Sequence, residues 1–414
     1  MTTTKTKTNA NKRRSLLILS FTLVVVMLGF GLVIPIFPFY IEALGAGGRE
    51  LGLLVATSAL LEFIFAPLWG GISDRSGRKP VLMIGIVGYG LSSLLFGLST
   101  QLWMLFAARA LSGVLSSAAL VTALAYVGDT TAAEDRGKGL GTLGAAMALG
   151  LILGPGLGGW LAGDSLSRPF FIAAALSLLA LLLIFLLLPE SLAAEKRSKG
   201  GGGKPSGARW HELRAALWSP IGVLLLMVAL FSFALTNFEA VFGLYALQKY
   251  DYGPEQVGTI LMVIAIVSTV GKATLTGPAT KRWGEAAVIK GSLLAGSVGF
   301  LALLLANSTI TILLATAFFI LSKTLLRPAA LALISKRATG GQGAAMGLSN
   351  SFISLGRIAG PVWAGFAFDA NVNYPYLSGS VIMFIGFLLA LALIAPQGAE
   401  AADEGVEAAK VDVV

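Results

Sequence analysis

Seven ionisable residues interrupt the long apolar runs of this sequence, and they carry most of the chemistry that those runs could perform. They are two acids and five bases: Glu62, Arg109, Glu239, Lys272, Lys323, Arg327 and Arg357. The chain has no Cys and one His, which excludes thiol chemistry, disulfides and clusters of Cys or His metal ligands. What remains is a carboxyl group that binds and releases a proton, beside cations that attract an anion.

Each of these charges would cost several kcal/mol if it faced lipid, so we expect each to face a cavity or a partner. Glu239 lies deep in its run and is our candidate for proton coupling, because loss of hydration favours the neutral form of a carboxyl group. Glu62 is a second candidate, with Arg109 as a possible neighbour. Arg327 also lies deep in its run, and Lys323 and Arg357 are candidate contacts for an anion.

The overall composition indicates a membrane protein. Of 414 residues, 56% are hydrophobic and 12% are charged, whereas about 25% are charged in a typical soluble domain. The net charge of +9 does not indicate nucleic-acid binding, because the basic residues gather in the short gaps between apolar runs.

Apolar runs of about 20 residues, the length that crosses a bilayer, predict an all-α integral membrane protein with twelve transmembrane helices. The expected spans are 16–42, 51–73, 80–98, 101–127, 139–163, 168–189, 220–248, 255–277, 286–306, 309–335, 343–368 and 374–396.

The Lys and Arg residues between these spans predict the orientation. Alternate gaps, together with the two tails, hold 22 of them, and the opposite gaps hold three. By the positive-inside rule, both termini are expected in the cytoplasm of a multi-pass cell-membrane protein. We expect a cytoplasmic tail (1–15), a six-helix bundle (16–190), a flexible basic linker (191–219), a second six-helix bundle (220–396) and an acidic disordered tail (397–414).

The two halves repeat one another at a constant offset. A shift of 206 residues places GLILGPGLGGW (150–160) on GRIAGPVWAGF (356–366) and RGKGLG (136–141) on QGAAMG (342–347). A constant offset indicates duplication, and an even number of spans per copy makes the copies parallel. We therefore expect two bundles related by a pseudo-two-fold axis.

A short charged segment joins the second and third spans, with the sequence GGISDRSGRKP (70–80). Its glycines permit a tight turn and close approach of helices, and Asp74 can accept hydrogen bonds from Arg75 or Arg78. We expect a gating charge loop that includes Gly71, Asp74, Arg75, Gly77, Arg78 and Lys79.

Four motifs carry a resemblance to a known family. The loop 70–80 resembles the signature of the major facilitator superfamily, and ALGLILGPGLGG (148–159) resembles that of its drug/proton antiporters. FAARALSGVLSSA (106–118) and LGFGLVIPIFPFY (28–40) resemble motifs of the fourth and first helices in the twelve-helix branch. The N-terminal half is similar to both tetracycline exporters and NorA-type multidrug exporters, and FALTNFEAVFGLY (233–245) and LLRPA (325–329) favour the latter.

This resemblance implies an exporter of amphipathic drug-like or small organic molecules in exchange for protons, by alternating access. It implies no enzyme activity and no cofactor beyond the proton gradient, and we expect a working monomer in the bilayer. NorA-type proteins carry an acid three residues before the Arg of RPA, where this sequence has Thr324. The acids that tetracycline exporters carry in helices 1 and 3 are missing from the matching stretches.

Two glycine–proline pairs sit in the middle of the fifth and eleventh spans. Proline removes a backbone hydrogen bond, and glycine lets neighbouring backbones approach. We expect these segments to bend and seal during transport; their residues are Gly150, Gly154, Pro155, Gly158, Gly159, Gly360 and Pro361.

Other classes of function are open to different degrees. A primary pump is excluded by the lack of a phosphate-binding loop in a suitable setting. A channel is a different mechanism, but it needs neither duplicated halves nor hinged helices. Because bases outnumber acids in the spans, export of an amphipathic organic anion, metabolite or glycolipid on the same fold is the alternative.

Overall fold

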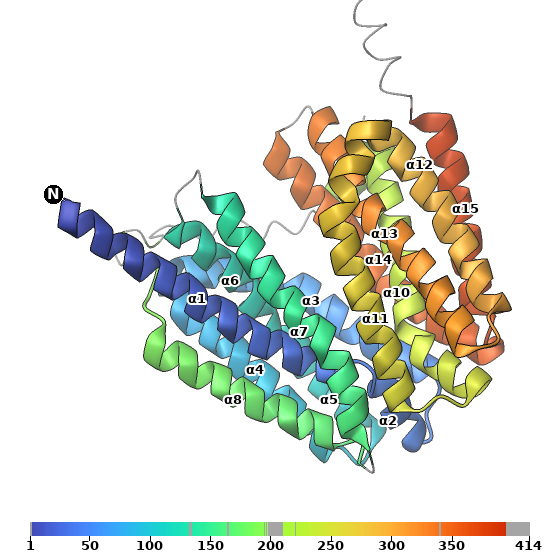
Figure 1. Ribbon diagram of the computed structural model, residues 1–414, viewed down its shortest axis with the longest axis horizontal. Coiled ribbons are helices and arrows are strands. Elements are labelled where there is room, and N and C mark those ends of the chain that lie inside the picture. Colours follow the sequence, from blue (N-terminus) through green and yellow to red (C-terminus); the bar gives the residue numbers. More distant parts are fainter. Residues whose placement is uncertain are drawn as a thin grey trace, which may run out of the picture. The chain divides into compact units, whose positions relative to one another are not determined.

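The computed structural model is all-helical (Figure 1) and describes residues 2–131, 135–163, 165–193, 195, 197, 210–219, 221–338 and 341–394. The side chains of residues 2–14, 136 and 210–212 are not described, so residues 2–14 of the N-terminal tail are known only as backbone. Residues 194, 196 and 198–209 of the expected linker and the whole C-terminal tail 397–414 also lie outside the described residues.

Two compact units make up the chain; one break between them, at 207/208, falls within the expected linker, whereas the segment 240–265 of the second expected bundle belongs to unit 1. Unit 1 comprises Met1–Gly207 and Ala240–Ala265, and unit 2 comprises Ala208–Glu239 and Ile266–Val414. Helices α10 (Gly222–Tyr250) and α11 (Pro254–Thr274) each contribute to both units.

In unit 1 the elements are α1 (Thr2–Val33), α2 (Phe37–Ala43), α3 (Gly48–Ser76), α4 (Arg78–Leu98), α5 (Leu102–Leu111), the π-helical turn η1 (Ser112–Ser116), α6 (Ser117–Thr130), α7 (Arg136–Ala162) and α8 (Arg168–Leu187). Helix α1 packs between α7 and α8, and α4 packs against α8 and α6. These helices run side by side in Figure 1.

In unit 2 the short helix α9 (Trp210–Leu217) lies within the segment expected to be a linker. It is followed by parts of α10 and α11 and by α12 (Thr276–Leu305), α13 (Thr309–Arg337), α14 (Gln342–Ala370) and α15 (Tyr374–Leu393). Helix α12 packs against α13 and α15, and α14 packs against α13 and α15.

Eleven helices of the described part are long and apolar enough to cross a membrane. The expected eleventh span is present as α14, a helix of 29 residues, but its polar residues keep it below that apolarity. The first expected span is broken at residues 34–36, beside Pro35, where α1 gives way to α2. The ninth begins earlier than expected, as a short helix that breaks at Gly284, where φ is +75°.

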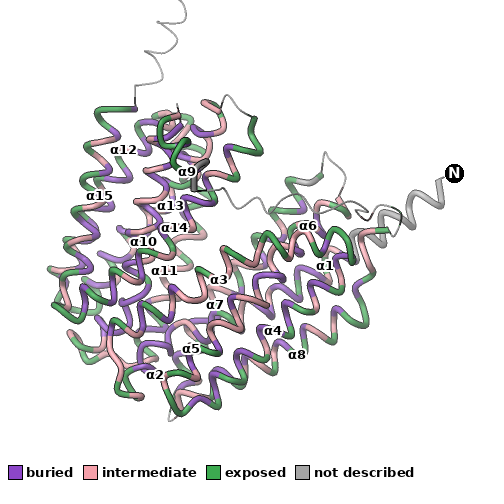
Figure 2. The backbone as a smooth tube through the Cα atoms, turned by 180° about the vertical axis from the view of Figure 1, so that it is seen from behind, coloured by how far each residue is buried: buried purple, intermediate pink, exposed green. Residues whose placement is uncertain are grey.

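Helix α8 shows how the sequence encodes its surroundings. Its buried face consists of Phe170, Ala173, Ser177, Ala180 and Ile184, at helical spacing. Its exposed face is also apolar, since Leu178, Leu182, Phe185 and Leu186 are all exposed. The alternation is visible along α8 in Figure 2. A helix that is apolar on its exposed face as well as on its packed face is suited to a lipid environment. Both faces of α8 therefore indicate a membrane helix.

Candidate functional site

The candidate proton site is an ion pair in unit 2. Lys323 of α13 donates a hydrogen bond from Nζ to Oε1 of Glu239 on α10, at 2.9 Å. Half of the Glu239 side chain is exposed, whereas the Lys323 side chain is 17% exposed. The sequence placed both charges inside membrane spans, and the structure brings them together, so Lys323 lies close enough to neutralise the Glu239 carboxylate.

Two further cations lie near this ion pair. Lys272 of α11 lies within electrostatic range of Glu239, Lys323 and Arg327. Arg327 follows Lys323 by one helical turn on α13, and it is exposed. Glu239, Lys272, Lys323 and Arg327 therefore form one charged cluster of unit 2 with a net charge of +2, and we call it the unit 2 charge cluster.

Small and hydroxyl side chains bring α11 against α13 at this cluster. A Cβ on Gly271 would meet Leu321 and Thr324 at van der Waals distance or closer. The hydroxyl of Thr324 is buried, donates to the carbonyl of Ile320 at 2.7 Å and lies 3.5 Å from the hydroxyl of Ser268. Thr324 thus provides a hydroxyl contact between helices where NorA-type proteins were expected to carry an acid.

Arg357 of α14 is exposed, and its charge lies within electrostatic range of Arg327. It was a candidate anion contact, and its position extends the positive field of the cluster towards α14.

Arg109 stacks on aromatic rings of unit 1. Its guanidinium carbon lies 3.9 Å from the ring centre of Phe37 on α2 and 5.6 Å from that of Phe96 on α4. Its Nε is buried with no hydrogen-bond partner among the described residues. Cation–π contacts with desolvated rings are worth about 2 kcal/mol. Glu62, whose distance from Arg109 the sequence leaves open, is half-buried on α3, and none of the described contacts of Arg109 is with it.

The charged loop forms a network around Arg78, the first residue of α4. Its side chain is largely buried and contacts three groups: Asp74 at 2.5 Å, Asp129 at 2.9 Å and the hydroxyl of Ser73 at 2.6 Å. Gly77 has a φ of +107°, a conformation that only glycine adopts readily, and this lets α3 end and α4 begin without a linker. Arg75 is exposed at the end of α3, and a Cβ on Gly71 would meet open space.

Two acids of this network were not among the predicted site residues. Asp129 lies in the last turn of α6, and Glu190 follows Pro189 just beyond α8. The carboxylate of Glu190 accepts hydrogen bonds from the backbone N–H groups of Arg78 and Lys79, at 2.8 and 3.1 Å, and so caps α4. The sequence feature that could have identified these two acids is their position, because each lies at the same end of a membrane span as the charged loop.

Unit 2 contains a counterpart of this network with the charges exchanged. Gly284 has a positive φ like Gly77, and Glu285 after it pairs with Lys336 at the end of α13. Arg78 and Asp129 lie 207 positions before Glu285 and Lys336, close to the offset of the repeat. Within each unit, one ion pair thus joins equivalent helix ends. The positions of the acid and the base are exchanged between the two units.

These two pairs should differ in strength. Arg78 and Asp129 are 10% and 24% exposed, whereas Lys336 is 58% exposed. Double-mutant cycles with Arg78→Gln/Asp129→Asn and Glu285→Gln/Lys336→Gln, measured by unfolding in mixed micelles, are expected to give coupling energies of about 1–3 kcal/mol for the first pair and below about 1 kcal/mol for the second. Equal coupling in the two units would contradict this.

The glycine–proline segments press helices together. A Cβ on Gly150 or Gly154 of α7 would lie within 3 Å of the α1 backbone, and one on Gly158 would strike the carbonyl of Leu32. Gly356 and Gly360 press α14 against α10 in the same way. A Cβ on Gly159 would meet Pro254 of α11, also in unit 1. Pro155 and Pro361 lie inside continuous helices.

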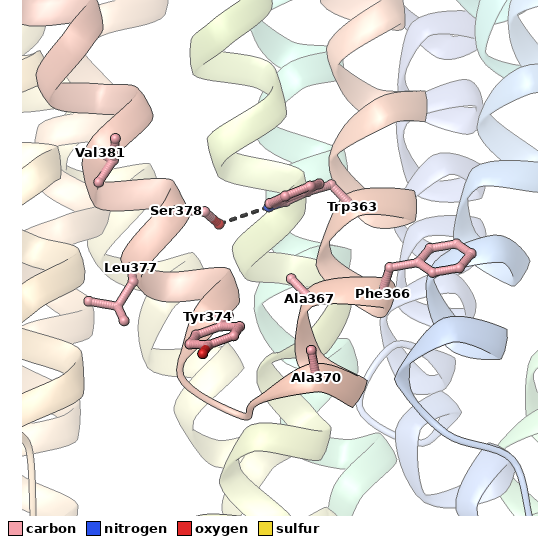
Figure 3. Close-up of a pocket in the computed structure, with 8 residues that line it drawn as sticks. All are labelled: Trp363, Phe366, Ala367, Ala370, Tyr374, Leu377, Ser378 and Val381. Carbon is pink, nitrogen blue, oxygen red and sulfur yellow. Dashed lines mark hydrogen bonds between the residues drawn. The ribbon is translucent and has the colours of Figure 1, made fainter.

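An apolar groove between α14 and α15 is a different kind of feature (Figure 3). Trp363 points from α14 towards α15 and donates a hydrogen bond from Nε1 to the hydroxyl of Ser378, at 2.9 Å. The remaining lining residues are Phe366, Ala367, Ala370, Tyr374, Leu377 and Val381. This lining has no acidic or basic side chain, so the groove is no candidate for proton coupling.

The fold and the charged helices define a membrane transporter. The sequence profile described as Major Facilitator Superfamily matches residues 19–322 and 224–413, and the chain belongs to this family, whose members are transporters and not enzymes. It is 32% identical over 91% of its length to Multidrug resistance protein 2 of Bacillus subtilis, covering 94% of that protein.

Other relatives and solved structures agree. Multidrug resistance protein 1 of Bacillus subtilis is 33% identical over 93% of this chain and 97% of its own length. Quinolone resistance protein NorA of Staphylococcus aureus is 29% identical over 91% and 96%. The crystal structure of the nucleoside transporter NupG superposes with a TM-score of 0.73 over 92% of this chain and 98% of that one, at 16% identity. The human organic anion transporter MFSD10 gives a TM-score of 0.67 over 92% and 99%, at 23% identity.

Proposed function

We propose that this transporter exports amphipathic drug-like or small organic molecules in exchange for protons, by alternating access. The observation that carries the proposal is the Glu239–Lys323 ion pair inside membrane-spanning helices. Sequence similarity to multidrug and quinolone resistance proteins supports the export of drug-like molecules. We further propose that the chain works as a monomer in the cell membrane with both termini in the cytoplasm.

The pair supplies a charge that changes when a proton binds. Ionised Glu239 is neutralised by Lys323, and a proton from outside removes the negative charge and releases the ammonium group. A substrate that hydrogen-bonds or pairs with Glu239 must displace Lys323 and competes with the proton for the same carboxylate. Each charge that moves across the membrane potential supplies about 2.3 kcal/mol per 100 mV.

A second candidate is export of an amphipathic organic anion, a class that includes acidic metabolites and glycolipids. Lys272 and Arg327 have no carboxylate within ion-pair distance in the described part of the chain. The unit 2 charge cluster is therefore positive even when Glu239 is ionised, and it would repel a simple cation. For an anion, protonation of Glu239 strengthens binding, because it removes a repelling charge and frees Lys323. Export of the anion would then follow its own gradient and a membrane potential that is negative inside, and not proton exchange.

Purified protein in proteoliposomes distinguishes these candidates. With an acidic lumen and the membrane potential clamped, proton exchange is expected to drive uptake of ethidium or a quinolone, and substrate affinity should fall as the external pH is lowered. If the anion candidate is right, p-aminohippurate is transported in preference to ethidium, and its affinity rises as the pH is lowered. Transport of any of these probes without dependence on the proton gradient would contradict proton exchange.

A further inference from the structure

A groove of about 450 Å³ opens in unit 1 where α8 ends, α4 begins and the apolar part of α1 begins. Its walls are Ser15 and Ile18 of α1, Lys79 of α4 and residues 186–189. The proposed function uses none of these side chains in proton or substrate binding. The groove lies at the end of the membrane spans that the Lys and Arg distribution assigns to the cytoplasm.

One wall of the groove carries a positive charge. The Lys79 ammonium donates to the carbonyl of Phe185 at 2.8 Å, and this described contact uses one of its three N–H groups. The nearby carboxylate of Glu190 accepts backbone N–H bonds from residues 78, 79, 191 and 192, so its charge is well compensated. In the sequence, Arg13 and Arg14 directly precede Ser15.

The other walls are apolar and continue into an exposed apolar track. Leu186 and Phe185 are 70% and 59% exposed at the end of α8, and Leu178 and Leu182 continue the same face along the helix. This face can be followed along α8 in Figure 2. Such a surface suits the hydrocarbon chain of a lipid, whereas a soluble anion would gain nothing from it.

We propose that this groove binds an anionic phospholipid of the cytoplasmic leaflet. The lipid phosphate lies against the Lys79 ammonium, and an acyl chain follows the exposed face of α8. Basic pockets between membrane helices on the cytoplasmic side are suited to acidic lipid head groups, and the apolar track selects a lipid over free phosphate. Lys79 belongs to the charged loop at the start of α4. A lipid bound in the groove therefore contacts this loop directly, and the loop senses which lipids the membrane contains.

The test measures lipid binding by the purified full-length chain in detergent. Dioleoylphosphatidylglycerol is expected to bind, as detected by native mass spectrometry, at least ten-fold more tightly than dioleoylphosphatidylcholine. Lys79→Gln should remove most of this preference, and Lys79→Arg should keep it. Lys281→Gln, which removes an exposed cation of α12 outside the groove, is the matched control and should bind like the wild type.

A second variant tests the apolar wall with the charge left in place. Ile18→Trp fills the groove and is expected to weaken phosphatidylglycerol binding several-fold, so the proposal can be tested even if Lys79→Gln does not fold. The proposal is overturned if Lys79→Gln binds phosphatidylglycerol like the wild type. It is also overturned if phosphatidylcholine binds equally well, or if inorganic phosphate alone shows the same dependence on Lys79.

Discussion

Proteoliposomes containing Glu239→Gln are expected to lose proton-driven export by at least ten-fold while the protein still inserts and folds. Glutamine has nearly the same shape as glutamate but cannot bind and release a proton, so the charge change that couples the two fluxes is lost. Lys323 also loses its anionic partner at 2.9 Å, which fixes the site in one charge state. The measurement is substrate uptake driven by an acidic lumen.

Two comparisons separate coupling from folding in this experiment. Glu255→Gln removes an exposed carboxylate in the first turn of α11 and should leave driven uptake near the wild-type rate. Glu239→Gln should still equilibrate substrate down its own gradient, because that process needs no proton. Driven uptake by Glu239→Gln at the wild-type rate would show that the pair is not the coupling site.

The sequence was sufficient to predict most of the membrane helices, because a spanning helix is marked by the length of its apolar run. It could not predict that Glu239 contacts Lys323. The two residues are 84 positions apart, and their contact depends on which helices are neighbours and on the rotation of each about its axis. For the same reason the sequence left the distance between Arg109 and Glu62 open, whereas the structure stacks Arg109 on Phe37.

The charged loop shows a second limit of sequence comparison. The repeat was found from glycines and prolines, which keep their identity where backbones approach closely. The counterpart of the Arg78–Asp129 pair was not found, because Glu285 and Lys336 carry the opposite charges. An ion pair can link two helix ends in either polarity, so the geometry is repeated while the residue types are not. The positive φ at both Gly77 and Gly284 reveals the equivalence.

Close helix contact in unit 1 gives the other large expected effect, which is that Gly150→Leu abolishes transport or makes the protein leak protons. A Cβ at this position would lie 2.6 Å from the backbone nitrogen of Leu28 and 2.7 Å from the carbonyl oxygen of Val24. These atoms belong to the α1 backbone and cannot rotate away, so α7 must move outwards from α1. Proton leak and substrate uptake in proteoliposomes, together with the melting temperature, measure the consequence.

A matched control lies in the same helix. Gly144 is also in α7, but a Cβ there would meet nothing within 4 Å, so Gly144→Leu changes helix propensity equally and leaves the contact with α1 intact. We expect Gly150→Leu to lower the melting temperature by several degrees and to lose tight proton exchange, and Gly144→Leu to do neither. If both variants transported like the wild type, the contact of α7 with α1 would be a packing feature that transport does not require. If both failed alike, the cause would lie in the added leucine itself and not in the distance between the helices.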